Sequence, residues 1–476
     1  MTSMRLTTLA LVAGAIAISF VTAVAQTAIP VPGARGAAPQ GGRGGRGNAA
    51  PANLPATPVA TAMPAISPEV TGPGPIFESL MKIRSGVDMA QFKYEAKEYF
   101  VSGTANGQPY KTRIVIRKPI DNAAFGGLIL AESMHPSGNA WMFHFTHLYA
   151  MTSGIIGLDV LTSTPAGFAD FNRGRYGDLK VEQGQASEIL AQVGALVRSK
   201  QADNPLAVLP IRKMVLAGTS ASAGVLVNYL PAHMVLRLAD MKPIYDGFLP
   251  TSNGATIQKV DVPLIQVPTL TEVQGGNATA RQDSDAPGDQ YRDYEFAGMA
   301  HLDSREADAY YPSPCRYPVS RFPVGAYMSV ALHHLVQWVD KGVVPPRADR
   351  ILVDRNVEND GSVMALDEYG NARGGIRNPY VDLPIKNYKV RNEGANPPIA
   401  NAHPFVASRG VEAQAQLCGL AGYETDLSAA QLKKLFKDKR DYQGKVARRV
   451  DELTRQGWSL PVYRDYILAD AARVAF

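Results

Sequence analysis

Short runs of β-branched and apolar residues alternate with longer helical patterns, which leaves few folds open to this sequence. The runs that we predict to be strands are Tyr110–Lys118, Gly127–Ser133, Gly154–Leu161, Lys213–Ala217, Tyr245–Pro250, Pro263–Leu270 and Tyr291–Phe296. Between the third and fourth runs, Glu182–Ser199 places its apolar residues on one helical stripe. Such units pack as a parallel sheet between helices. We therefore predict an α/β class, with a mostly parallel, twisted sheet and helices on both faces.

The first 25 residues have the layout of a secretory signal peptide, with Arg5, an apolar run over Leu9–Val21 and Ala-Val-Ala at 23–25. A retained membrane anchor is the alternative, but the run is short against the roughly 20 residues that span a bilayer. Residues 26–75 are rich in Gly, Pro, Ala and Arg, and we expect a disordered linker because they have little to bury. Residues 76–476 should form a single elaborated domain. We expect export, to the periplasm or beyond the cell.

Composition excludes several kinds of function. The formal net charge is only +5, and arginines of the N-terminal region contribute much of it, which argues against a nucleic-acid partner. Cys315 and Cys418 are the two cysteines, too few for a disulfide framework or a four-thiolate metal site, and they form one bridge at most. No segment after residue 25 is long and apolar enough to span a membrane. We expect no metal and no organic cofactor.

The segment MVLAGTSASAGVLVNYL, residues 214–230, is the most informative of the sequence. A buried strand stops at Gly218, turns through small residues and resumes as a helix. At such an elbow the middle serine is held in a tight turn with its hydroxyl exposed, and small neighbours are needed because the strand and helix backbones nearly touch. We predict Ser220 as a nucleophile and the Ala221 amide as an oxyanion donor. Ser222 departs from the more frequent Gly-x-Ser-x-Gly form, and the same letters without a strand and helix around them would usually be a serine-rich loop.

A serine hydroxyl needs a base whose pKa lies near neutral pH, and histidine is the natural choice. In hydrolases built on such a sheet, this histidine follows the last core strand. His301 stands in the loop after the predicted strand Tyr291–Phe296, 81 residues beyond Ser220. Four other histidines fit worse: His333 and His334 in a predicted helix over Tyr327–Val339, His233 in a loop and His403 in the C-terminal tail.

The acid that orients the histidine should stand just after the preceding strand, Pro263–Leu270. Glu272 does so and is our choice, with Asp283 or Asp285 as the reserve. An acid in a polar loop is usually solvated surface, so only its place in the strand order distinguishes Glu272.

The second oxyanion donor of such a site comes from the loop after an earlier strand, here Gly127–Ser133. We predict that a backbone N–H of Met134 or His135 serves, because Pro136 has none.

A metal site is an alternative use for His135, His144 and His147. We discount it, because no carboxylate at His-Glu-x-x-His spacing accompanies them. The aromatic-rich turns over Trp141–Tyr149 more often pack a core or line a pocket.

Beyond residue 346 the pattern weakens. Val363–Val381 is typical of a hairpin with its turn at residues 369–371, and Ser428–Asp451 of a charged surface helix. The pattern does not say whether these segments cover an active site.

These stretches together resemble a known group of large bacterial proteins with an alpha/beta hydrolase domain. The resemblance covers most of the chain from about Gly126 onward, through LAESMHPSG at 130–138, RGRYGDL at 173–179, the elbow at 218–222, Thr271-Glu272, Tyr291–Asp303 and GGIRNPYVDLP at 374–384. The group carries a Gly-x-Ser-x-Ser elbow, so Ser222 is normal there, whereas Ala221 stands where the family commonly has glutamine. The resemblance implies an α/β-hydrolase fold with C-terminal elaborations and a serine esterase, without naming its substrate.

We expect hydrolysis of a small-molecule carboxylic ester through an acyl-enzyme on Ser220, His301 and Glu272. Acyl transfer, amide hydrolysis or lactone opening on the same residues is one alternative, because such a triad does not choose the acceptor. A non-catalytic exported binding protein is another. A dinucleotide-dependent oxidoreductase is set aside, because the first βαβ unit has no glycine-rich turn. The oligomeric state and the pairing of the two cysteines stay open.

Overall fold

The computed structural model describes residues 54–79, 88–163, 167–275, 281–302, 305, 314–353, 363–397 and 411–476. The predicted signal peptide, the linker up to residue 53 and His403 lie outside the described residues. The strands are β1 (Val59–Ala60), β2 (Ala65–Ile66), β3 (Tyr94–Ala105), β4 (Gln108–Pro119), β5 (Leu128–Ser133), β6 (Ile156–Val160), β7 (Lys213–Thr219), β8 (Leu236–Arg237), β9 (Gly247–Thr251), β10 (Leu264–Gln266), β11 (Tyr291–Asp293), β12 (Lys386–Lys389) and β13 (Tyr423–Asp426). The α-helices are α1 (Trp141–Thr152), α2 (Gly167–Phe171), α3 (Arg173–Tyr176), α4 (Ala186–Arg198), α5 (Ala221–Val235), α6 (Leu270–Gln274), α7 (Val324–Lys341), α8 (Pro379–Asp382), α10 (Val411–Leu420), α11 (Ala429–Leu435), α12 (Lys439–Gln456) and α13 (Arg464–Arg473).

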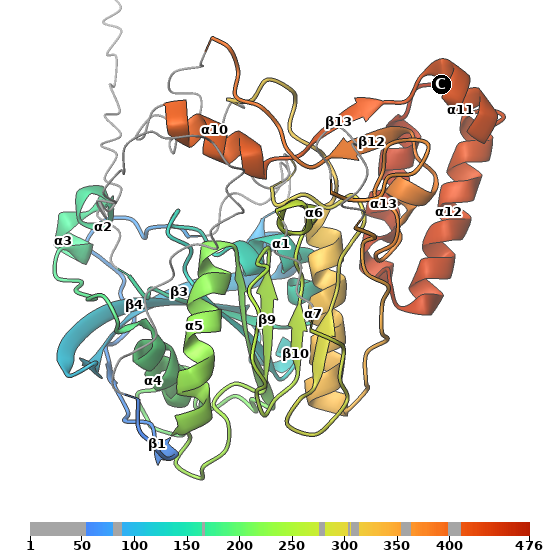
Figure 1. Cartoon of the computed structure of the whole chain (residues 1–476). Helices are drawn as coiled ribbons and strands as arrows, with labels where there is room; N and C mark the ends of the chain where they lie inside the picture. Colours follow the sequence, from blue (N-terminus) through green and yellow to red (C-terminus); the bar gives the residue numbers. More distant parts are fainter. Residues whose placement is uncertain are drawn as a thin grey trace, which may run out of the picture.

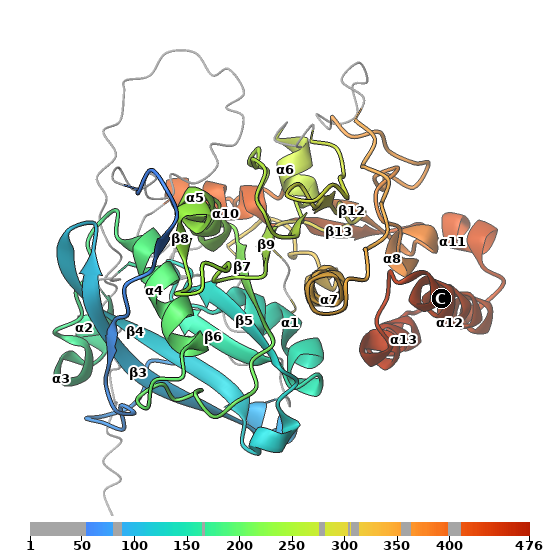
Figure 2. The same cartoon turned by 90° about the horizontal axis from the view of Figure 1, so that it is seen from below.

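A nine-stranded sheet with the order β11-β10-β9-β7-β5-β6-β4-β3-β2 forms the centre of the molecule (Figures 1 and 2). Neighbouring strands from β11 to β6 run parallel, and β4, β3 and β2 continue the sheet with antiparallel pairing. All seven predicted strands belong to this sheet, with ends shifted by a few residues. The predicted mostly parallel α/β sheet is therefore confirmed, with an antiparallel edge that was not predicted.

Helices cover the two faces of the sheet. On one face, α1 and α7 pack over the parallel strands and share a core with the C-terminal helices, whereas α4 and α5 lie on the other face (Figure 2). The predicted helix Glu182–Ser199 is α4, and its apolar stripe is buried against the sheet as its 3.6-residue period requires. The crossovers bring the carboxyl ends of β5, β7, β9, β10 and β11 to one edge of the sheet, which is where α5 and α6 begin.

Of the longest hairpin, β3–β4, the sequence pattern predicts strand β4 but not strand β3. Its turn is Asn106-Gly107, with φ of 49° and 70°, and Ala105 pairs with Gln108. Positive φ at both turn residues is the geometry that an Asn-Gly pair favours between two strands. This dipeptide is the signal that would have identified β3.

The linker prediction is wrong for residues 54–75. There β1 pairs with β8 and β2 pairs with β3, and Leu54 and Ile66 pack against the core. Main-chain hydrogen bonds, such as those from the amides of Ser67 and Val70 to carbonyl oxygens of β3, hold this segment in place. A segment poor in large side chains is ordered here by the unpaired backbone groups of a sheet edge.

Two predictions for the C-terminal region also change. The predicted helix Ser428–Asp451 is two helices, because Phe436 is extended and buried between them and Asp438 caps the start of α12. The predicted hairpin keeps its turn, since the Asp367 amide donates to the Asn371 carbonyl, but it forms isolated bridges rather than long strands. No helix in the described ranges is long and apolar enough to cross a membrane.

Candidate active site

Ser220 lies at the junction of β7 and α5, in the elbow that the sequence predicts. Its φ and ψ are 54° and −118°, a backbone conformation rare for a residue with a side chain. The Ser220 amide donates to the carbonyl of Thr251 at the end of β9, 3.0 Å away. The turn is thus fixed from the neighbouring strand, and the Ser220 side chain is only half-buried.

Gly218 and Ser222 explain why the elbow has this composition. A Cβ on Gly218 would lie 2.6 Å from the carbonyl carbon and oxygen of Ser222, so no side chain fits there. The buried Ser222 hydroxyl accepts a hydrogen bond from the Thr219 amide (2.9 Å) and donates to the Thr219 carbonyl (2.8 Å). Ser222 therefore ties the first turn of α5 back to the end of β7, which a glycine at this position cannot do.

Glu272 and His301 form a pair at the same edge of the sheet. Nδ1 of His301 lies 2.7 Å from Oε1 of Glu272, and the two side chains are 7% and 10% exposed. The other carboxylate oxygen accepts from the amide (2.8 Å) and the hydroxyl (2.6 Å) of Thr269, which completes a capping box at the start of α6. The acid therefore holds both the histidine and the start of its own helix.

A succession of main-chain bonds crosses the edge from Ser220 to His301. Beyond the Ser220–Thr251 bond, the amide of Ser252 donates to Val267, and the amide of Leu270 donates to Met299. The His301 amide donates to the hydroxyl of Thr271 at 3.2 Å. These bonds place the serine and the histidine on one rim. No hydrogen bond joins the Ser220 hydroxyl to His301 in the described part of the chain.

The reserve acids lie elsewhere. Asp283 pairs with Arg350 and Asp285 with Arg347 and Arg292. Both carboxylates are therefore engaged in an arginine cluster, and Glu272 is the acid that contacts His301.

The electrostatics of Glu272 favour its ionised form. Burial alone would raise its pKa, but the charge of His301, the hydrogen bond with that ring and the bonds from Thr269 together lower the pKa below its ordinary value. An ionised Glu272 accepts a hydrogen bond from Nδ1–H of His301. In the neutral ring, this tautomer leaves Nε2 unprotonated.

The three predicted oxyanion donors differ in whether their main-chain amides already have an acceptor. The Ala221 amide stands in the first turn of α5, where no helical carbonyl can accept from it. By contrast, the Met134 amide donates to Val160 (2.8 Å) and the His135 amide to Asn139 (3.0 Å). Neither of these amides is open to a ligand in this structure, because the Met134 amide is bonded to β6 and the His135 amide closes a turn of its own loop.

Glu132 shapes this loop and was not predicted. Its buried carboxylate accepts hydrogen bonds from the main-chain amides of Met142 and Phe143 at the start of α1, each at 2.9 Å. Burial and then the charge of Asp159 raise the pKa of Glu132 to about 8. An acid inside a buried strand, nine residues before a helix that lacks a side-chain cap, is the signal that could have identified it.

His135 lies close enough to His301 for their charges to interact. Burial first, and then the charge of His301, lowers the pKa of His135 to about 4, so this ring is neutral near pH 7. Its Nδ1 lies 2.8 Å from the Ser137 hydroxyl. The loop after β5 and the loop carrying His301 thus share one region of the edge.

The other described histidines have structural partners. His147 contacts the carbonyl of His144 within α1, His333 the Tyr149 hydroxyl and His334 the Gly457 carbonyl. The prediction of a loop at His233 is wrong: it is buried in α5, which continues past Pro231, and bonds Asp261 at 2.8 Å. Within the described ranges, no group of three or more His, Cys, Asp or Glu side chains has the arrangement of a metal site.

Comparison with known proteins identifies one family. Residues 55–469 match a family model described as an alpha/beta hydrolase domain. No curated protein matches the sequence. Solved structures with a similar arrangement include a cold-adapted esterase from an Arctic intertidal metagenomic library (10% identity, 42% of this chain and 84% of that one, TM-score 0.24). Another is a thermostable esterase from Pseudomonas putida (13% identity, 52% and 82% covered, TM-score 0.32). At these values the likeness does not extend to activity or substrate.

Proposed function

This chain belongs to the alpha/beta hydrolase domain family, and on that basis we propose that it is a serine hydrolase that cleaves small-molecule carboxylic esters. The observation that supports the proposal best is the His301–Glu272 pair (2.7 Å), buried at the edge of the sheet that also carries the strained Ser220 elbow. A strained, half-buried serine and an oriented histidine on one rim are the parts that nucleophilic catalysis needs.

In the proposed reaction, the Ser220 hydroxyl attacks the ester carbonyl and gives its proton to Nε2 of His301. Glu272 accepts from Nδ1 and stabilises the imidazolium, and the Ala221 amide donates to the oxyanion. The carbon–oxygen bond to the alcohol then breaks, and His301 returns the proton to the leaving alcohol. Water, deprotonated by His301, attacks the acyl-enzyme and releases the carboxylic acid and Ser220. The reaction requires the Ser220 hydroxyl to come within hydrogen-bond distance of Nε2 of His301, and such bonds often tighten only with substrate bound.

The decisive experiment compares the wild type with Ser220→Ala. We expect the wild type to hydrolyse a short-chain aryl ester and to be labelled at Ser220 by a fluorophosphonate, and the variant to fold but do neither. Ser187→Ala is the matched control, because this buried serine lies in α4, away from the elbow, and makes only a 3.5 Å contact with the Asn228 carbonyl, so it should leave labelling intact. Undiminished labelling of Ser220→Ala would end the assignment.

Acyl transfer, amide hydrolysis and lactone opening would use the same three residues. A panel of aryl esters, anilides and lactones, assayed with and without an added alcohol acceptor, separates these reactions. Faster turnover of an anilide or lactone than of every ester would replace the ester proposal and keep the triad. Failure of all of them, with no labelling, would favour the binding-protein alternative.

We also propose that the chain is exported. The signal-like first 25 residues support this, and so does the disulfide between Cys315 and Cys418, because such bonds persist in oxidising compartments. N-terminal sequencing of the protein recovered outside the cytoplasm should show cleavage after residue 25. An intact N-terminus on the recovered protein would contradict cleavage.

A further inference from the structure

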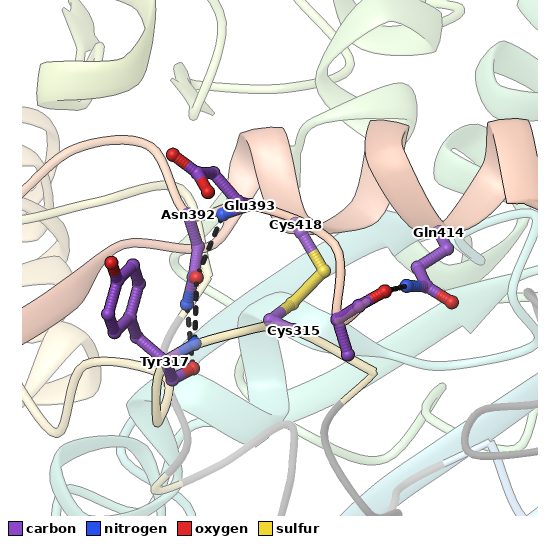
Figure 3. The surroundings of a disulfide bond; sticks show 7 residues. Cys315, Tyr317, Asn392, Glu393, Gln414 and Cys418 are labelled. Carbon is purple, nitrogen blue, oxygen red and sulfur yellow. Dashed lines mark hydrogen bonds between the residues drawn. A yellow bond between two sulfur atoms is a disulfide. The ribbon is translucent and has the colours of Figure 1, made fainter. Parts of the chain in front are cut away.

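The Cys315–Cys418 disulfide joins two segments that flank the candidate base. Cys315 stands 14 residues after His301, and Cys418 lies in the last turn of α10, 103 residues further on. Figure 3 shows the bond between a loop and this helix, and in Figure 1 α10 and β13 lie above the edge of the sheet where α6 follows β10. The bridge is therefore on the side of the sheet where His301 lies.

The chain just after Cys418 contacts both neighbours of His301. Leu302 forms a bridge pair with Ala421, and Leu302 packs on the apolar cluster of Cys315, Cys418 and Ala421. On the other side, a Cβ on Gly422 would lie 2.6 Å from the Cβ of Ala300, so the Gly422 backbone abuts Ala300. His301 is thus held between two residues that rest on the segment anchored by the disulfide.

Hydrogen bonds make the segments around the bridge one unit (Figure 3). The Asn392 side chain accepts from the Tyr317 amide (3.2 Å) and donates to the Tyr317 carbonyl (2.8 Å). The Asn392 amide donates to the carbonyls of Cys418 and Ala421, both at 3.0 Å. Asn392 therefore links the loop after Cys315 to the end of α10, and the disulfide joins the same two segments covalently.

We propose that Cys315 and Cys418 are positioning residues for His301: the disulfide keeps the 418–422 segment against Ala300 and Leu302, and so keeps the imidazole in place on the rim that carries Ser220. This rests on the proposed function. A covalent cross-link removes conformational freedom that the hydrogen bonds alone would leave, and a misplacement of about 1 Å at a reacting group can lower the rate about 100-fold. Cys418 is fully buried and Cys315 is 8% exposed, so the bridge is a permanent support, shielded from dissolved thiols.

The test is the double variant Cys315→Ala, Cys418→Ala. We expect kcat for an aryl ester and the rate of fluorophosphonate labelling to fall roughly 10- to 100-fold, with KM changed little, because neither cysteine is proposed to touch the substrate. Gln414→Ala is the matched control. It removes a hydrogen bond from α10 to the Ala395 carbonyl but leaves the disulfide in place, and it should keep both rates. Unchanged kcat and labelling in a folded double variant would overturn the proposal.

A second variant keeps the test decisive if the double variant does not fold. Gly422→Ala leaves the disulfide intact but places a methyl group against Ala300 and the Lys389 carbonyl, so that the segment must shift away from Ala300, and it should lower kcat and labelling in the same way. Full activity of this variant would also overturn the proposal. Failure of the proposed function is a different result, because the wild type itself would then neither turn over the ester nor be labelled at Ser220.

Discussion

The Glu272 carboxylate divides its two oxygens between two partners: Oε1 faces Nδ1 of His301 at 2.7 Å, and Oε2 receives both bonds from Thr269. The side chain that orients the histidine is therefore itself oriented by the start of α6. Since the capping box forms within four consecutive residues, local contacts of α6 set the orientation of the acid.

Glu272→Gln should lower kcat by about 10⁴-fold, because an amide nitrogen facing Nδ1 favours the wrong tautomer of His301. Glutamine is accepted in a capping box, so α6 should remain intact, and the thermal midpoint should barely move. Steady-state kinetics and thermal unfolding check both points. Asp285→Asn, in the arginine cluster, is the control and should retain kcat. An equal loss in this control would refute the choice of Glu272.

Gly218→Ala should destabilise the protein by about 1–3 kcal/mol and displace Ser220, because the added Cβ would overlap the Ser222 backbone. Chemical denaturation measures the free energy of unfolding, and fluorophosphonate labelling reports the elbow. Gly444 lies in the interior of α12 with ordinary contacts around it. Gly444→Ala should instead raise the free energy of unfolding by about 0.5–1 kcal/mol, because alanine is favoured over glycine within a helix. Two variants of equal stability would show that the elbow is not tightly packed.

Ser222→Ala should lower the free energy of unfolding by about 1–3 kcal/mol, because the buried Thr219 amide loses its hydrogen-bond acceptor. Ser187→Ala is a close match, since Ser187 is also buried but makes only a 3.5 Å contact with a carbonyl. Its unfolding free energy should change less. If both variants lose the same stability, the Ser222 bond does not hold the elbow together.

Glu132→Gln should change how stability depends on pH. Burial and the charge of Asp159 raise the pKa of Glu132 to about 8, whereas an unfolded glutamate titrates near 4.3. Between these values the folded state holds a proton that the unfolded chain has released, so this group makes stability fall as pH rises. Glutamine does not titrate. The stability deficit of the variant relative to the wild type should therefore be smaller at pH 8 than at pH 5.

Urea denaturation of both proteins at the two pH values tests this. Glu182→Gln, with an exposed side chain, is the control and should run parallel to the wild type. A Glu132→Gln curve parallel to the wild type would mean that Glu132 does not titrate in this window.

Much of the fold and site was readable from local pattern. The parallel strands, the elbow around Ser220 and the alpha/beta hydrolase resemblance, which the family match confirms, depend on spacing within short segments. The order of strands then singled out His301 and Glu272, because carboxyl ends of neighbouring parallel strands meet at one edge. The structure pairs these two side chains, while the catalytic triad stays a prediction.

What the amino-acid sequence alone determined is therefore local: which segments are strands or helices, and which residues stand at their ends. Tertiary structure alone decided the partners, since it ordered residues 54–75 along a sheet edge, engaged the Met134 and His135 amides, and joined Cys315 to Cys418 beside His301. The physical reason is that periodicity and turn chemistry act over a few residues. Tertiary partners, in contrast, can lie far apart in the sequence, 103 residues in the case of Cys315 and Cys418, and they meet only when the core has packed.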